Sequence, residues 1–85
     1  MTEENMENES SVYLISDLAA LTGLSHYTIE FYIKLGLVTD IRRTSRSRYR
    51  LFGQRALEEL RKVMELRRKK VPLKEIKERM NNGIL

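Results

Sequence analysis

The chain has 85 residues, contains no cysteine and carries a formal net charge of +4. This length provides for one small domain, and the lack of cysteine excludes disulfides, a thiolate nucleophile and cysteine metal sites. No segment approaches the roughly 20 apolar residues that span a bilayer, and the N-terminus lacks the basic start and apolar centre of a secretion signal. We therefore expect a cytoplasmic protein that does not enter a membrane.

Residues 1–11 differ in charge from the rest of the chain. They hold four glutamates, Glu3, Glu4, Glu7 and Glu9, show no apolar periodicity, and are predicted to form a disordered acidic tail. Residues 12–85 are predicted to be the single folded domain, and they contain all 16 basic residues but only eight of the 12 acidic ones. A domain this basic is expected to bind a polyanion or an anionic surface.

Two short helices are predicted on either side of Gly23, over residues 15–22 and 25–35. In the first helix, Ser16 is expected to cap the N-terminus and Asp17 suits its positive end. In the second helix, apolar residues recur one turn apart on an inward face, and the outward face carries His26, Tyr27, Glu30 and Lys34. A helix, a tight turn containing Gly and a second helix with an outward polar face are typical of helix-turn-helix DNA readers.

Residues 39–52 are predicted to form a β-hairpin, with strands over 41–44 and 48–52 joined by a Ser-Arg-Ser turn. Side chains along the second strand alternate between its two faces, and at the end of the strand Phe52 is predicted to turn inward. The hairpin also holds Tyr49 and five arginines: Arg42, Arg43, Arg46, Arg48 and Arg50. Clustered guanidinium groups repel one another, and phosphates offset this repulsion best because each can accept paired hydrogen bonds from Arg. An acidic protein partner is the alternative.

Two further helices are predicted after the hairpin. The longer one runs from Gln54 to about Lys69, with apolar residues spaced by three and four, and Glu58 is expected to pair with Lys62 one turn on. Pro72 suits the first turn of a last short helix. Its apolar residues are predicted to join the core: Leu73, Ile76 and Met80.

The chain lacks the residue sets that catalysis requires. Its one histidine, His26, falls on the outward face of the second helix, and Asp17 and Asp40 are its two aspartates. It has no Gly-rich phosphate loop and no paired-histidine motif. We therefore expect no enzyme activity, no metal site and no cofactor.

Seven short fragments follow one another in a consistent order: residues 15–19, 22–25, 28–29, 31–32, 36–37, 49–52 and 73–76. Together they resemble the N-terminal DNA-binding domain of MerR-type transcription regulators, and the likeness runs from about Tyr13 to Met80. The resemblance implies a mostly α winged helix-turn-helix fold with a two-stranded β-hairpin wing and a supporting C-terminal helix pair.

The resemblance also implies a DNA-binding site. The helix over 25–35 is expected to enter the major groove, and the wing over 39–52 to lie on the flanking phosphate backbone. The expected contact residues are His26, Tyr27, Thr28, Glu30, Arg42, Arg43, Arg46, Arg48, Tyr49 and Arg50. Among them, His26, Tyr27 and Glu30 would lie nearest base edges. The resemblance places Arg43, Tyr49 and Arg50 at positions that contact the DNA backbone. It places Phe52 at a position usually occupied by an aromatic residue that packs in the core.

Three features depart from the family pattern. Glu30 stands where the family usually has Arg, so it is expected either to accept from a cytosine amino group or to pair with a neighbour such as Lys34. Ser47 and Arg48 occupy a wing turn that commonly carries Asn-Gly. Family members also continue into a dimerisation helix and often an effector domain, which do not follow Leu85. No small-molecule effector is therefore expected to bind this chain.

The sequence predicts sequence-specific binding of double-stranded DNA in bacterial transcription regulation. Reading a palindrome requires a homodimer. The sequence leaves open a fragment of a regulator, a stand-alone domain that dimerises by another surface, and a small architectural protein. The alternative functions are an excisionase-like or architectural DNA-bending protein and a protein-interaction module for an acidic partner. RNA is less favoured because an α-helix cannot read the narrow major groove of A-form RNA.

Overall fold

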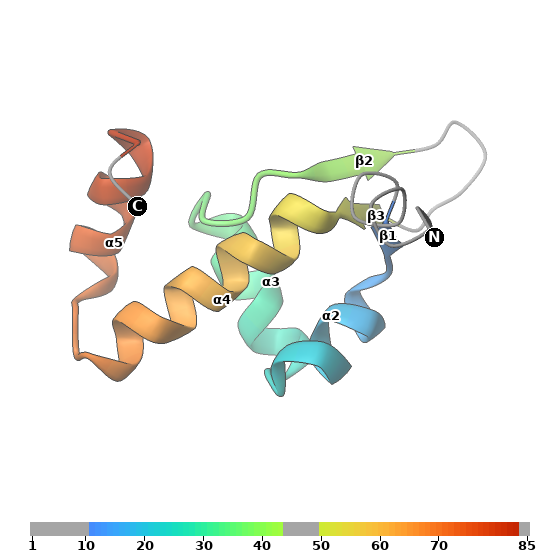
Figure 1. Cartoon of the computed structure of the whole chain (residues 1–85), viewed down its shortest axis with the longest axis horizontal. Helices are drawn as coiled ribbons and strands as arrows, with labels where there is room; N and C mark the ends of the chain where they lie inside the picture. The colour runs from blue at the N-terminus through green and yellow to red at the C-terminus, as the bar shows by residue number, and fades with distance from the viewer. Residues whose placement is uncertain (1–10, 44–49, 84–85) are drawn as a thin grey trace, which may run out of the picture.

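The computed structural model describes residues 11–43 and 50–83. In chain order the elements are β1 (Val12–Tyr13), α2 (Ile15–Thr22), α3 (His26–Lys34), β2 (Ile41–Arg43), β3 (Arg50–Gly53), α4 (Gln54–Arg68) and α5 (Leu73–Asn81). Helix α4 runs along the molecule, α2 and α3 pack against it, the strands gather near its start, and α5 lies at its far end (Figure 1). The predicted mostly α class with a small β wing is confirmed.

The sheet has three antiparallel strands in the order β1-β3-β2, one more than the predicted hairpin. Strand β1 pairs with β3 on one side, with Val12 opposite Gly53. On the other side, β2 pairs with β3, with Ile41 opposite Phe52. The hydroxyl of Tyr13 donates to Gln54 Oε1 at 2.8 Å and so fastens β1 to the start of α4. The Ser-Arg-Ser turn lies outside the described residues.

Helix α3 begins and ends where its sequence predicts. Ser25 has an extended backbone, and its Oγ accepts a hydrogen bond from the Thr28 N–H at 3.1 Å. At the other end Gly36 adopts a φ of +82°, a left-handed conformation that glycine adopts without steric cost. The Leu37 N–H then donates to the Tyr32 carbonyl at 3.0 Å. These contacts fix the length of the helix.

Helix α2 begins differently from its prediction. Leu14 is its N-cap, and the Leu14 N–H donates to Asp17 Oδ2 at 2.8 Å. The prediction that Ser16 caps this helix is wrong, because Ser16 lies within the first turn. Gly23 closes the helix with a φ of +80° and turns the chain toward α3.

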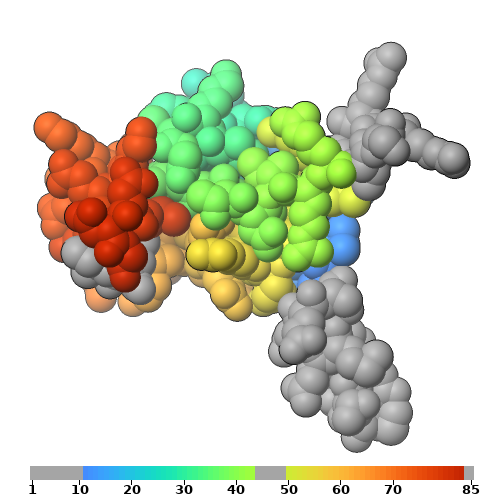
Figure 2. Space-filling model, turned by 90° about the horizontal axis from the view of Figure 1, so that it is seen from above, coloured from blue at the N-terminus to red at the C-terminus, as the bar shows by residue number. Residues whose placement is uncertain are grey.

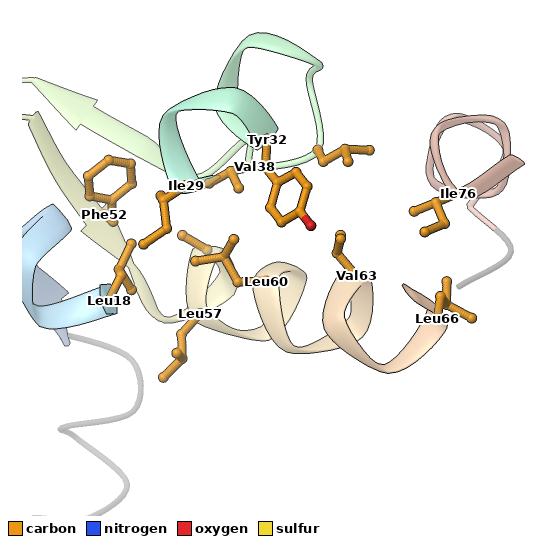
Figure 3. Packing of buried hydrophobic residues seen from close by; sticks show 12 residues of the cluster. Leu18, Ile29, Tyr32, Val38, Phe52, Leu57, Leu60, Val63, Leu66 and Ile76 are labelled. Atoms are coloured by element: carbon orange, nitrogen blue, oxygen red, sulfur yellow. The ribbon is translucent and has the colours of Figure 1, made fainter. Parts of the chain in front are cut away.

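One hydrophobic core joins the helices and the sheet (Figure 3). Phe52 of β3 is fully buried beside Leu18 of α2 and Ile29 of α3, so the prediction that Phe52 turns inward is confirmed. The buried residues of α4 follow the predicted spacing: Ala56, Leu57, Leu60, Val63 and Leu66. Fully burying a side chain such as Ile or Phe contributes about 1.5–3 kcal/mol. Burial of Ile29 and Tyr32 in this shared core therefore sets where α3 stands.

The acidic residues of α4 pair differently from their prediction. Lys62 Nζ lies 3.7 Å from Glu65 Oε1, and Lys69 Nζ lies 3.6 Å from Glu65 Oε2. The prediction that Lys62 pairs with Glu58 is therefore wrong. Both observed pairs are exposed, and each contributes at most about 1 kcal/mol to stability.

Candidate nucleic-acid interface

Helix α3 presents one face to the core and the other to solvent. Ile29 is fully buried and Tyr32 is 8% exposed, whereas Tyr27 is 81% exposed and His26 is also exposed. The spacing of three between Ile29 and Tyr32 places both on the inward face. The outward placement of His26 and Tyr27 agrees with the sequence prediction.

Thr28 lies at the edge of this outward face and is half-buried. Its N–H donates to Ser25 Oγ, and its Oγ1 accepts from the Ser25 hydroxyl at 3.0 Å. Thr28 therefore helps to cap α3. Its own hydroxyl proton can still donate to a ligand.

Phe31 belongs to the outward face but is absent from the predicted site. It is 42% exposed, and its side chain follows Tyr27 by one helical turn. A shallow hollow of about 110 Å³ lies between Tyr27, Glu30, Phe31 and Lys34. The spacing of four from Tyr27 is the sequence signal that could have placed Phe31 here.

The wing starts from a loop that α4 holds in place. Glu59 of α4 accepts two hydrogen bonds from Thr39, from its N–H at 2.8 Å and from its hydroxyl at 2.5 Å. Next along the chain, Arg42 Nε lies 3.4 Å from Asp40 Oδ1. Arg43 is exposed and stands opposite Arg50 in the strand pairing. Within the described residues, Arg43 has no ion pair.

An ion pair joins the outward face of α3 to the wing. Arg50 Nη2 donates to Glu30 Oε2, although 20 residues separate the two in the chain. Of the two arrangements expected for Glu30, pairing with a neighbouring side chain is the one observed, and the neighbour is Arg50 in place of Lys34. The Arg50 guanidinium also lies 5.8 Å from the centre of the Phe52 ring. The hydrogen bond from Arg50 lowers the pKa of the Glu30 carboxyl below its ordinary value of 4.5, and the charges of Lys34 and His26 act in the same direction.

The structure thus brings together two parts of the predicted site through the contact between Glu30 and Arg50. His26, Tyr27 and Thr28 lie on α3, and Arg42 and Arg43 lie on β2. Three predicted contact residues lie outside the described part of the chain: Arg46, Arg48 and Tyr49. Seen from above, the segment from α3 to β2 forms a continuous surface between α5 and β1 (Figure 2).

Three further observations concern residues 11–43 and 50–83. A second hollow, of about 340 Å³, lies away from this site and is lined by Arg55, Glu58, Glu59, Lys62, Met80 and Gly83. No set of three His, Cys, Asp or Glu side chains within these ranges is grouped to hold a metal ion. Over the same ranges, none of the helices has the length and apolar character needed to cross a membrane.

A helix-turn-helix with an exposed second helix, followed by an arginine-bearing strand pair, defines the winged helix-turn-helix class of DNA-binding domains. Residues 13–83 match the family described as MerR HTH family regulatory protein, so the chain belongs to this family. Its members are DNA-binding transcription regulators and not enzymes. The resemblance noted in the sequence is thereby confirmed.

A curated relative agrees with this assignment. The chain is 37% identical over 73 residues to the HTH-type transcriptional regulator CueR of Bacillus subtilis (strain 168). The aligned region covers 86% of this chain and 50% of that protein. The chain therefore spans half the length of this relative.

Proposed function

We propose that residues 12–85 bind double-stranded DNA sequence-specifically and act in transcription regulation. Helix α3 enters the major groove, and the wing of β2 and β3 lies on the flanking phosphate backbone. The observation that carries this proposal is the outward face of α3, where Tyr27 is 81% exposed while Ile29 on the opposite side is fully buried. An α-helix about 10–12 Å across fits a major groove about 12 Å wide.

The residues divide into base readers and backbone holders. His26 and Tyr27 lie on the exposed first turn of α3, from which helix-turn-helix proteins contact base edges. Arg42 and Arg43 of the wing, with Arg46, Arg48 and Tyr49 in the segment that follows them, contact phosphates in this proposal. Among the described strand residues, Arg43 is the arginine whose charge no carboxylate offsets. Substitution of Arg43 is therefore the most direct test of the contact between the wing and the DNA backbone.

Arg43→Ala is expected to weaken binding to every duplex to a similar extent, because a phosphate contact carries no sequence information. The slope of log K against log salt concentration should fall by about 0.9 for the lost contact. Fluorescence anisotropy with a labelled duplex of mixed sequence, titrated between about 50 and 200 mM salt, measures both quantities.

Arg61→Ala is the matched control for this measurement. Arg61 is exposed on α4 and lies between the buried positions Leu60 and Val63, so its removal changes the net charge equally without touching the wing. An equal loss in both variants would contradict a specific contact by Arg43. If the unmodified chain binds no duplex even at low salt, the proposed function is wrong, and an acidic protein partner becomes the better explanation for the basic wing.

Tyr27→Ala is expected to change which sequence is preferred, because Tyr27 is placed to read bases. Selection from a pool of randomised duplexes compares the preferred sites of the two proteins. Tyr27→Phe, which keeps the ring and removes only the hydroxyl, separates hydrogen bonding from apolar contact with thymine methyl groups. A uniform loss of affinity with an unchanged preferred sequence would rule out base reading by Tyr27.

A further inference from the structure

The contact between Glu30 and Arg50 places a negative charge on the face proposed to meet DNA. Glu30 lies on the outward side of α3, and its side chain remains 39% exposed while it accepts the hydrogen bond from Arg50. The Arg50 side chain is less accessible, at 26% exposed. The Glu30 carboxylate is thus the more accessible member of the pair, and the Arg50 guanidinium that it neutralises is the less accessible one.

Arg50 is held in this position from two directions. Its guanidinium lies over the ring of Phe52, which is fully buried. One of its terminal nitrogens donates to Glu30. A guanidinium over an aromatic face gains roughly 0.5–1 kcal/mol even at exposed sites. Arg50 would have to give up these contacts to turn fully toward a phosphate.

The charges around Glu30 are uneven. His26 and Lys34 lie one turn before and one turn after it on α3, and Arg50 faces it from β3. Of these three, Arg50 makes the hydrogen bond, so its charge is offset most directly. The positive charge available to a DNA phosphate at the junction between α3 and the wing is therefore lower than the number of arginines indicates, because Glu30 offsets Arg50.

We infer that Glu30 restrains the affinity for DNA by neutralising Arg50 at the junction between α3 and the wing. This inference rests on the proposed function. Because the neutralised contact would be to the backbone, the restraint acts on every sequence and chiefly lowers sequence-independent binding. Glu30 is thus a positioning residue that holds Arg50 back, and base reading is left to other residues of α3.

Glu30→Gln tests this inference, because glutamine can still accept the hydrogen bond from Arg50 but carries no charge. Affinity for a duplex of mixed sequence should rise by up to roughly eightfold near 0.1 M salt, and the salt slope should steepen by about 0.9, as expected for one additional phosphate contact. Fluorescence anisotropy on the full chain over a range of salt concentrations measures both. Glu30→Ala should change the affinity in the same direction.

Two controls isolate the junction. Glu78→Gln removes an equal charge from exposed Glu78 on α5, at the end of α4 away from the sheet, and should change the affinity little because salt screens charges beyond about 10 Å. In an Arg50→Gln background, Glu30→Gln should no longer raise the affinity, because no guanidinium charge remains at position 50 for Glu30 to offset. Circular dichroism confirms that each variant is folded.

The outcomes separate this inference from the proposed function. If the unmodified chain binds duplex DNA and Glu30→Gln binds no more tightly, the inference is wrong and the proposed function stands. A gain of the same size in Glu78→Gln, or one that persists without Arg50, also overturns it. If neither the unmodified chain nor Glu30→Gln binds duplex at low salt, both are wrong.

Discussion

Glu30 is held in its charged form by the hydrogen bond from Arg50, which lowers the pKa of its carboxyl, with smaller effects of Lys34 and His26 in the same direction. A carboxyl whose pKa is lower in the folded than in the unfolded protein stabilises the fold above its ordinary value of 4.5. This contribution is lost as the pH falls through the lowered folded value. Because the side chain is 39% exposed, solvent screening keeps the contribution small.

Glu30→Gln is therefore expected to melt at a lower temperature than the unmodified chain near neutral pH, and the difference should shrink as the pH falls below 4.5. Thermal unfolding followed by circular dichroism at a series of pH values measures this difference. Arg50→Gln removes the partner and should show the same trend. If the difference in melting temperature between Glu30→Gln and the unmodified chain stays constant as the pH falls below 4.5, the ionisation of Glu30 does not stabilise the fold.

At the scale of elements, the junction between β3 and α4 depends on close packing at Gly53. A Cβ at this position would lie 2.1 Å from Asp40 Oδ2 and 2.5 Å from Arg42 Nη2. The backbone of Gly53, with a φ of −90°, suits any residue, so the requirement is for space and not for conformation. The Asp40–Arg42 ion pair therefore lies directly against the start of α4.

Gly53→Ala is expected to destabilise the protein by about 1 kcal/mol or less, because the added methyl group displaces the ends of the Asp40 and Arg42 side chains. Urea denaturation measures the loss. In an Asp40→Ala background the penalty of Gly53→Ala should be smaller, since the nearest obstructing side chain has gone. Fully additive effects of the two substitutions would show that Asp40 does not cause the clash.

Helix patterns and single caps could be predicted from the sequence because they depend on residues a few positions apart. The spacing of apolar residues predicted α3 and α4, and Ser25 and Gly36 marked the ends of α3. Strand β1 is too short to show alternation, and its partner β3 lies about 40 residues further along the chain. For Glu30 the sequence suggested Lys34 as an example of a neighbouring partner, because helical spacing relates only residues a few positions apart, and it did not indicate Arg50. Only the packing of β3 against the helices brings Arg50 close.

At the scale of the whole molecule, the proposed reading helix and the wing share one support. Ile29 of α3 and Phe52 of β3 meet in the same core beside Leu18 (Figure 3). The ion pair between Glu30 and Arg50 joins α3 to β3 outside this core. The last helix, α5, stands apart at the end of α4, where Ile76 lies near Leu66. The geometry of the candidate interface is therefore set by α2, α3, α4 and the sheet, while α5 adds Ile76 to the far end of the same core.

The strand order of the sheet also determines when it can form during synthesis. Val12 and Tyr13 emerge early from the ribosome, but their partners are Gly53 and Phe52. Until those residues have been made, β1 has no strand to pair with. The contacts between α2 and α3, by contrast, join neighbouring segments and need no distant partner. A growing chain can thus bring its two first helices together before the sheet that will carry the wing exists.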